Sequence, residues 1–286
     1  MKFASYSVSD GAAKPLQHGW GMVDGEFIVP MTSAWPTLRE AIAAGSDAIA
    51  ARAGKIAAQR IALNSVTLKP PVPDPGKIFC IGLNYGKHIA ETGRERPAHP
   101  SVFVRHIQSF VGHGSGVLRP WISEQFDYEA ELTVVIGRAG RHIKVADAMR
   151  HVFGYTCAAE NSVRDFQKHA TQATAGKNFD DSGALGPYVV TADAAAPLSE
   201  MVVTGRLNGE QMQSAPVTDL IFSVPELIAY LSSFNALQPG DMILTGTPEG
   251  VGMVRNPPRW MNKGDVFEVD IKGVGLLSNP VIQENK

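Results

Sequence analysis

The sequence predicts an α+β protein made mostly of β-strands, with a small domain preceding a larger one. Short apolar or alternating runs of strand length recur between Gly, Pro and Asn-Gly turn signals, whereas helical patterns are few. The segment KPPVPDPG, residues 69–76, contains four prolines, which neither a helix interior nor a central strand accommodates. We therefore expect residues 1–73 to form a small N-terminal α/β domain and residues 74–286 to form the larger domain.

The composition is that of an ordinary globular protein. Of the 286 residues, 44% are hydrophobic and 19% are charged, and the formal net charge is -2. A net charge this close to zero does not favour binding to nucleic acid or to an anionic membrane. Cys80 and Cys157 lie in apolar segments and predict no disulfide framework, and no targeting or membrane-spanning run is present. We expect a cytoplasmic protein whose partners are small molecules or copies of itself.

The N-terminal residues predict a β-hairpin followed by a helix. Asp24-Gly25 marks a tight turn between two alternating segments. Pro36-Thr37 opens a helix-prone, alanine-rich stretch that extends to Arg60, with breaks near Gly45 and Gly54. No residue in this part has a catalytic pattern.

A buried strand over residues 77–83 leads into a short helix that carries the first candidate catalytic pair. Asn84 is placed to cap this helix, and Gly93 is placed to end it. His88 and Glu91 are three residues apart and so share a helical face, where the carboxylate would orient the imidazole as a general base. The alternative is an incidental ion pair on an exposed helix. The glycines around the pair favour a mobile segment that closes over a site.

A pair of glutamates, Glu129 and Glu131, precedes the apolar run LTVVI. On an extended strand both project from the same face, with Cα atoms about 6.5 Å apart. Two unpaired carboxylates beside a packed interior repel each other and are costly to bury, so a cation is expected between them. The alternative is an exposed strand edge where lysine or arginine neutralises both.

Further polar residues follow the later strands. Glu160 directly follows the apolar run at residues 152–159, and functional groups often lie at such strand ends. Lys177 precedes another strand. It is either a contact for a phosphate or carbonyl group or a solvated loop charge. Arg105 ends a short strand as a surface charge or an anion contact. The glycine-rich loop after residues 242–244 lacks the P-loop and dinucleotide signatures and suits a small carboxylate.

Seven motifs in order make residues 75–286 resemble the catalytic domain of the fumarylacetoacetate hydrolase family. They are GLNY at 82–85 with His88 and Glu91, DYEAEL at 127–132, GYT at 154–156, SVRDFQ at 162–167, GKNFD at 176–180, GP at 186–187 and GDMILTGTP at 240–248. The resemblance implies a mixed β-sandwich roll that encloses Mg²⁺ or Mn²⁺, in a homodimer. Residues 1–73 would correspond to the small, variable N-terminal domain of many members.

The resemblance also implies roles for individual residues. Metal ligands would be Glu129, Glu131 and Glu160; His88, Glu91 and Lys177 would be catalytic; and Tyr85, Arg164, Gln167 and Thr247 would bind substrate. One departure concerns the third ligand, because the family usually has Asn-Asp where this chain has Ala159-Glu160. The additional methylene moves the carboxylate outward by about 1 Å, which a backbone shift, bidentate binding or a displaced ion must absorb.

The function that the resemblance implies is hydrolysis of a carbon–carbon bond. The substrate would be an acylpyruvate-type 1,3-dicarbonyl acid such as fumarylpyruvate, maleylpyruvate or a 2,4-diketo acid, cleaved to pyruvate and a carboxylic acid. An oxo-acid decarboxylase or isomerase is the alternative within the same chemistry. A non-catalytic protein with a degenerate metal site is the alternative from another class.

Overall fold

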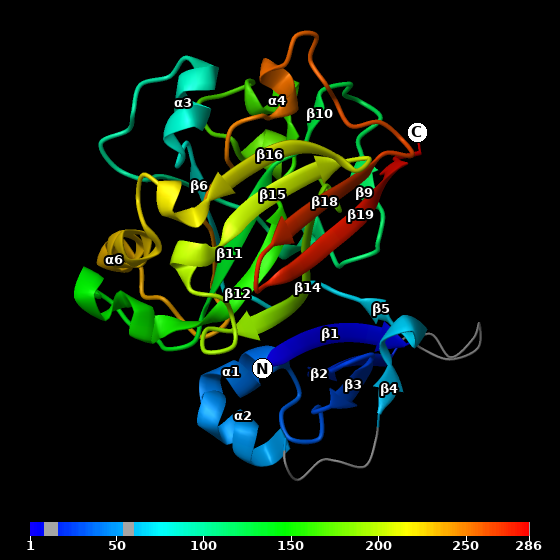
Figure 1. Cartoon of the computed structure of the whole chain (residues 1–286), viewed down its shortest axis with the longest axis vertical. Helices are drawn as coiled ribbons and strands as arrows, with labels where there is room; N and C mark the ends of the chain where they lie inside the picture. Colours follow the sequence, from blue (N-terminus) through cyan, green and yellow to red (C-terminus); the bar gives the residue numbers. More distant parts are fainter. Residues whose placement is uncertain (9–16, 54–59, 286) are drawn as a thin grey trace.

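The computed structural model describes residues 1–8, 17–53 and 60–285 (Figure 1). The strands are β1 Lys2–Val8, β2 Gln17–Asp24, β3 Phe27–Pro30, β4 Ile61–Ala62, β5 Thr67–Leu68, β6 Ile78–Gly82, β7 Ser101–Val104, β8 Phe110–Val111, β9 Val117–Arg119, β10 Phe126–Asp127, β11 Ala130–Ile136, β12 Val152–Ala159, β13 Ser162–Val163, β14 Gly183–Thr191, β15 Val202–Leu207, β16 Glu210–Pro216, β17 Met242–Leu244, β18 Val266–Ile271 and β19 Gly275–Gln283.

Helices are fewer than strands in the described part of the chain. The α-helices are α1 Leu38–Ala44, α2 Ser46–Ala53, α3 Gly86–Thr92, α4 Arg164–Gln167, α5 Thr174–Lys177 and α6 Val224–Phe234. The 3-10 helices are η1 Leu63–Ser65, η2 Ile107–Ser109, η3 Val145–His151, η4 Leu198–Glu200, η5 Val217–Asp219 and η6 Gly252–Val254. The predicted mostly β, α+β class is confirmed.

Two large sheets pack face to face as an open sandwich. The larger sheet has the order β4-β3-β2-β1-β14-β12-β11-β17-β6-β7, and the smaller has the order β16-β15-β18-β19-β9. Strands β11, β12 and β14 of the first sheet lie against β15, β18 and β19 of the second (Figure 1). Leu132, Val203 and Leu277 are among the apolar side chains buried between them. This packing fixes the central strands from which the site residues project.

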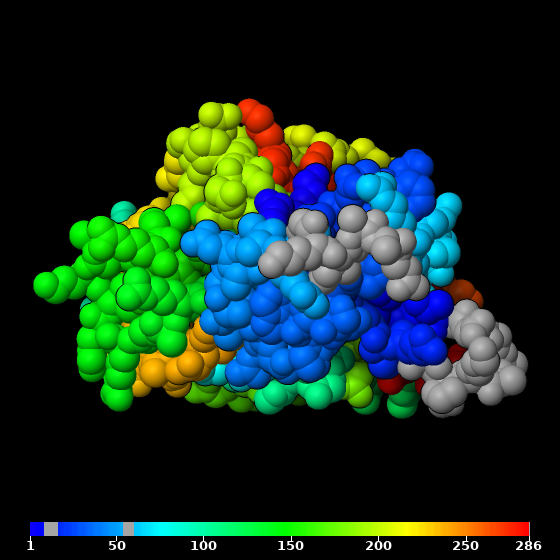
Figure 2. Space-filling view, turned by 90° about the horizontal axis from the view of Figure 1, so that it is seen from below, coloured from blue at the N-terminus to red at the C-terminus, as the bar shows by residue number. Residues whose placement is uncertain are grey.

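The N-terminal strands continue the larger sheet. Strand β1 pairs with β14 in antiparallel register, Phe3 opposite Val189, and helices α1 and α2 cover this end of the molecule (Figures 1 and 2). Leu38 and Ile42 of α1 share one apolar cluster with Cys80 and Met242 of the central strands. The division at residues 73/74 stays a prediction, and the two parts bury apolar surface against each other.

Several local predictions match the described elements. Strands β2 and β3 form the hairpin at Asp24-Gly25, and Gly25 has a positive φ of 60° that glycine adopts without strain. Thr37 caps α1, and Gly45 separates α1 from α2. The part of the helix prediction that falls on residues 54–59 lies outside the described residues. Among the described residues, no helix is both long and apolar enough to cross a bilayer.

The predicted capping role of Asn84 is wrong. Tyr85 occupies the N-cap of α3, and no side chain caps the helix there. The buried Asn84 side chain instead donates to the carbonyls of Thr245 and Phe222, at 2.8 and 3.1 Å, and accepts from the N–H of Phe222 at 2.8 Å. Tertiary partners outcompete the local cap because each of these backbone groups needs a partner after burial. Asn84 therefore ties the end of β6 to two distant loops.

We expect Asn84→Ala to lower the free energy of unfolding by about 3 kcal/mol, since it leaves buried backbone groups without partners. Urea denaturation followed by circular dichroism measures this change. Asn262→Ala is the control, because Asn262 is exposed; its effect is expected to stay within about 0.5 kcal/mol. Equal stability of Asn84→Ala and wild type would contradict the tying role.

Candidate metal centre and active site

The central strands bring their polar ends to one edge of the larger sheet. Ala130 of β11 is paired with Ala159 of β12, so Glu129 and Glu160 face each other just beyond that pair, and the Glu160 N–H donates to the Glu129 carbonyl at 2.8 Å. Strand β17 lies on the other side of β11 and leads into the glycine-rich loop at residues 246–252. Strand β6, parallel to β17, delivers α3 to the same edge. Antiparallel pairing thus gathers residues that are far apart in the sequence.

Three buried glutamates meet at this edge. Glu129, Glu131 and Glu160 each offer a carboxylate oxygen that lies within 4.8 Å of the other two. The residues are only 5%, 2% and 1% exposed, respectively, which excludes the alternative of an exposed strand edge. Three carboxylate oxygens this close together could all bind one divalent ion.

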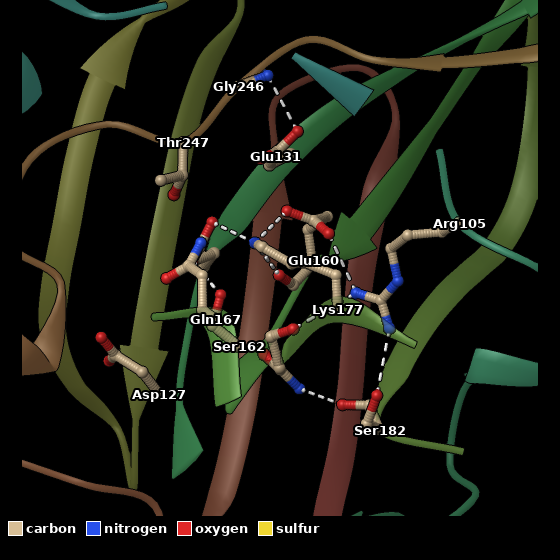
Figure 3. A network of polar contacts seen from close by, with 12 residues as sticks. Arg105, Asp127, Glu131, Glu160, Ser162, Gln167, Lys177, Ser182, Gly246 and Thr247 are labelled. Carbon is tan, nitrogen blue, oxygen red and sulfur yellow. Dashed lines mark hydrogen bonds and ion pairs between the residues drawn. The ribbon is translucent and has the colours of Figure 1, made fainter. Parts of the chain in front are cut away.

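Cations pair with Glu129 and Glu160, two of the three carboxylates. Figure 3 shows Lys177 and Arg105 beside Glu160. The Lys177 Nζ donates to Glu129 Oε2 at 3.0 Å and also to Glu160 Oε2. Arg164 Nη1 lies 2.8 Å from Glu129 Oε1, which also accepts from Ser162 Oγ at 2.6 Å. Buried charges are tolerated only when paired in this way.

The pKa values of the three carboxyls diverge for physical reasons. Burial raises the pKa of Glu131 well above its usual range, and the charges of Glu160 and Glu129 raise it further. Burial also raises the pKa of Glu160, against the opposing effects of Lys177 and Arg105. Burial acts in the same direction on Glu129, but Lys177 and Arg164 outweigh it and lower its pKa to about 2. Glu131 therefore has the greatest need of an additional positive charge.

The donor set fits a hard divalent cation. Glu131 Oε2 accepts from the Gly246 N–H at 2.8 Å, but within the described residues Glu131 forms no ion pair. A site of three carboxylates offers only oxygen ligands. Mg²⁺ and Mn²⁺ prefer such ligands, whereas softer metals prefer sulfur or nitrogen. The donor chemistry does not separate the two ions.

His88 and Glu91 form a connected pair on α3. The His88 Nδ1 lies 2.7 Å from Glu91 Oε1, and the Gly250 N–H donates to Glu91 Oε2 at 2.8 Å. Glu91 is thereby held from both sides, and it fixes the imidazole ring with Nε2 as its remaining nitrogen. His88 is buried, so the alternative of a pair on an exposed helix face does not describe it.

A pocket of about 770 Å³ lies over the three carboxylates. All predicted site residues except Glu91 and Tyr85 line it. Glu91 contacts the pocket-lining His88 through its carboxylate. Tyr85 is 1% exposed, and its hydroxyl is buried without a hydrogen-bond partner in the described structure. The substrate-binding role of Tyr85 stays a prediction that the pocket lining does not favour.

The remaining predicted substrate residues differ in how firmly they are held. Arg164 donates through Nε to Asp127 at 2.8 Å and through Nη1 to Gln167 at 3.0 Å. Its Nη2 is buried with no hydrogen-bond partner among the described residues. Thr247 Oγ1 donates to the Ala130 carbonyl and accepts from Gln213 Nε2. Arg164 thus lines the pocket with a side chain whose Nη2 is buried and unpaired among the described residues.

Three supporting residues had no assigned role in the sequence. Arg105, left open as a surface charge or an anion contact, is 3% exposed and pairs with Glu160 at 3.0 Å. Asp127 accepts from Arg164 and from the N–H groups of Gly252 and Met253. Gln213, on β16, bonds Ala130 and Thr247. Asp127 could have been found from its position within the DYEAEL motif. No local sequence pattern identifies the partners of Arg105 or Gln213.

The match to a family model agrees with this geometry. Residues 77–282 match the model of the fumarylacetoacetate hydrolase C-terminal domain. The chain belongs to the fumarylacetoacetate hydrolase family. This membership confirms the resemblance that the seven motifs indicated. The matched segment contains the three glutamates, the His88–Glu91 pair and Lys177.

Relatives within the family have more than one activity. Oxaloacetate tautomerase Fahd2a, mitochondrial, of Rattus norvegicus is 38% identical over 92% of this chain and 85% of its own length. Oxaloacetate tautomerase YisK of Bacillus subtilis is 42% identical over 77% of this chain and 74% of its own. The solved structure of maleylpyruvate hydrolase from Sphingobium sp. SYK-6, in complex with manganese(II) and pyruvate, superposes with a TM-score of 0.81 at 28% identity and full coverage of both chains. The chain is therefore similar to both tautomerases and a hydrolase.

We expect Mn²⁺ affinity to fall with decreasing pH. Glu131 must lose its proton to bind a cation, and its pKa lies above the ordinary value of 4.5, so competition by protons begins above pH 4.5. Below the raised pKa, each pH unit is expected to weaken binding about tenfold. Calorimetric titration at several pH values, in buffers of different ionisation enthalpy, measures both affinity and proton release. A pH-independent affinity would contradict the raised pKa.

Proposed function

We propose that the protein catalyses proton transfer between the keto and enol forms of a short 2-oxo dicarboxylic acid of the oxaloacetate type, with Mg²⁺ or Mn²⁺. The observation that carries this proposal is the position of His88, which lines the same pocket as the three buried carboxylates. The tautomerase relatives support the choice of reaction over the other activities in the family.

Glu129, Glu131 and Glu160 would hold the divalent ion. When bound, such an ion supplies positive charge that acidifies the carbon next to the oxo group and orients the substrate. The protein side chains then have to bind the acid, exclude water and move one proton. This division of roles explains why a keto-enol isomerase needs a cation site and no nucleophilic serine or cysteine.

His88 is the proposed proton carrier. With Nδ1 bonded to Glu91, its Nε2 is available to take a proton from carbon or return it to oxygen. Glu91 keeps the ring in one orientation because its second oxygen is held by the Gly250 N–H. Lys177, buried between Glu129 and Glu160, contributes positive charge for the developing negative charge on the substrate.

The anionic groups of the substrate have candidate partners in the pocket wall. Arg164 offers Nη2, a buried donor with no protein partner among the described residues. Gln167 and Thr247 line the same wall. The positive charge of Arg164 in this wall would attract a substrate carboxylate.

Hydrolysis of an acylpyruvate is the second candidate. The His88–Glu91 pair favours it, since a histidine oriented in this way also takes a proton from water. The fold similarity to maleylpyruvate hydrolase supports it as well. Decarboxylation of an oxo acid draws on the same cation-assisted chemistry. Membership of a family of enzymes argues against the third interpretation, a non-catalytic metal-binding protein.

Assembly and location are also proposals. We propose that the protein acts as a homodimer on a small oxo acid, without nucleic acid or membrane partners. The cytoplasm is the proposed compartment, although the rat relative is named as mitochondrial. Sedimentation of the purified chain, with and without Mn²⁺, tests the dimer.

Substrate panels distinguish the two candidate reactions. The tautomerase proposal predicts faster decay of the oxaloacetate enol absorbance with Mg²⁺ or Mn²⁺ and no pyruvate from maleylpyruvate or fumarylpyruvate. Coupling to lactate dehydrogenase detects that pyruvate. Rapid pyruvate release without enol conversion would contradict the tautomerase and establish the hydrolase.

We expect His88→Gln to lower kcat by about 10²–10³-fold, because the proton carrier is lost. Glu91→Gln is expected to have a smaller effect, about tenfold, because the ring loses its orientation but not its nitrogen. His99→Gln is the matched control, since His99 stacks on Tyr230 outside the pocket lining. Mn²⁺ affinity should be unchanged in all three. Wild-type turnover in His88→Gln would exclude the proposed role.

A further inference from the structure

Arg105 is buried beside the cation site and touches only one of the three carboxylates. It follows β7, its N–H donates to the Ile78 carbonyl at 3.2 Å, and its side chain is 0% exposed. Nη1 donates to Glu160 Oε1 at 3.0 Å and to the Asn161 carbonyl at 3.3 Å (Figure 3). Arg105 does not line the pocket, so it acts on the site through Glu160.

The guanidinium of Arg105 is held from all sides. Nε donates to Ser109 Oγ at 3.0 Å, and Nη2 donates to the Ser109 carbonyl at 3.2 Å and to Ser182 Oγ at 3.1 Å. The planar group also lies over the Phe110 ring, 4.2 Å from its centroid. Gly183 leaves room for it, because a Cβ there would lie 2.9 Å from Nη2. Such a fully bonded arginine has a fixed orientation.

The two oxygens of Glu160 therefore have different environments. Oε1 accepts a hydrogen bond from Arg105, whereas Oε2 accepts one from Lys177 (Figure 3). A glutamate has one more rotatable bond than an aspartate, so its carboxylate is harder to hold in a single position. The fixed arginine removes that freedom.

We propose that Arg105 is a positioning residue that holds Glu160 Oε1 and presents only Oε2 to the divalent cation. This arrangement lets a glutamate serve where the family usually has an aspartate. The inference rests on the cation site of the proposed function. An aspartate at position 160 has a side chain about 1 Å shorter, so it would not reach Arg105 and the cation together.

Calorimetric titration of Mn²⁺ into the full-length protein tests the proposal, with the Mn²⁺ electron paramagnetic resonance spectrum as a second readout. We expect Arg105→Met and Glu160→Asp each to weaken Mn²⁺ binding by about 10–100-fold. The double variant should be about as weak as the weaker single variant, since both remove the same contact. Arg105→Lys should recover only part of the affinity, because one ammonium cannot replace the fork of donors.

Arg206→Met is the matched control, since Arg206 pairs with Asp270 and does not line the pocket; its Mn²⁺ affinity should equal that of wild type. If circular dichroism shows that Arg105→Met does not fold, the Mn²⁺ affinity of Glu160→Asp, which keeps the negative charge, tests the proposal instead. Variants that bind Mn²⁺ within about threefold of wild type, or full recovery in Arg105→Lys, would overturn the positioning role. Absence of Mn²⁺ binding to wild type would instead overturn the cation site, and this inference with it.

Discussion

The burial of three carboxylates at one sheet edge is the constraint on which the rest of the structure depends. Glu129, Glu131 and Glu160 are each at most 5% exposed, and an unpaired charge in such a position is costly unless the carboxyl is protonated. Lys177 and Arg105 neutralise part of this charge from two sides. The sandwich supplies the rigid strands that hold these groups, and the proposed divalent cation would complete the charge balance.

His88, the proposed proton carrier, depends on the same sheet edge through backbone hydrogen bonds. Gly250 donates its N–H to Glu91, while its carbonyl accepts from Tyr128 Oη and Arg255 Nε. A side chain is excluded there, because φ is +99° and a Cβ would lie 2.1 Å from the Met212 carbonyl. The loop that follows β17 thus positions helix α3 relative to the carboxylates. The positions of His88 and of the three carboxylates are therefore set by one scaffold.

Much of the fold and site followed from local patterns, and the rest required long-range contacts. The turn at Asp24-Gly25 and the shared face of Glu129 and Glu131 were predictable because turn chemistry and strand alternation are local. Glu160 was grouped with them only through the family resemblance, because it follows a different strand. The capping role of Asn84 was wrong because distant backbone groups compete for its amide. The partner of Arg105 was not predictable, since Glu160 lies 55 residues away. The choice between tautomerase and hydrolase depends on pocket contacts that carry no short motif.

Anomalous diffraction from crystals grown with Mn²⁺ tests the central claim most directly. The account predicts one strong peak within about 2.3 Å of a carboxylate oxygen from each of Glu129, Glu131 and Glu160. That peak should disappear in crystals of Glu131→Gln, while the fold is unchanged. A peak elsewhere, or three carboxylates that remain paired only with Lys177, Arg164 and Arg105 at saturating Mn²⁺, would contradict the account.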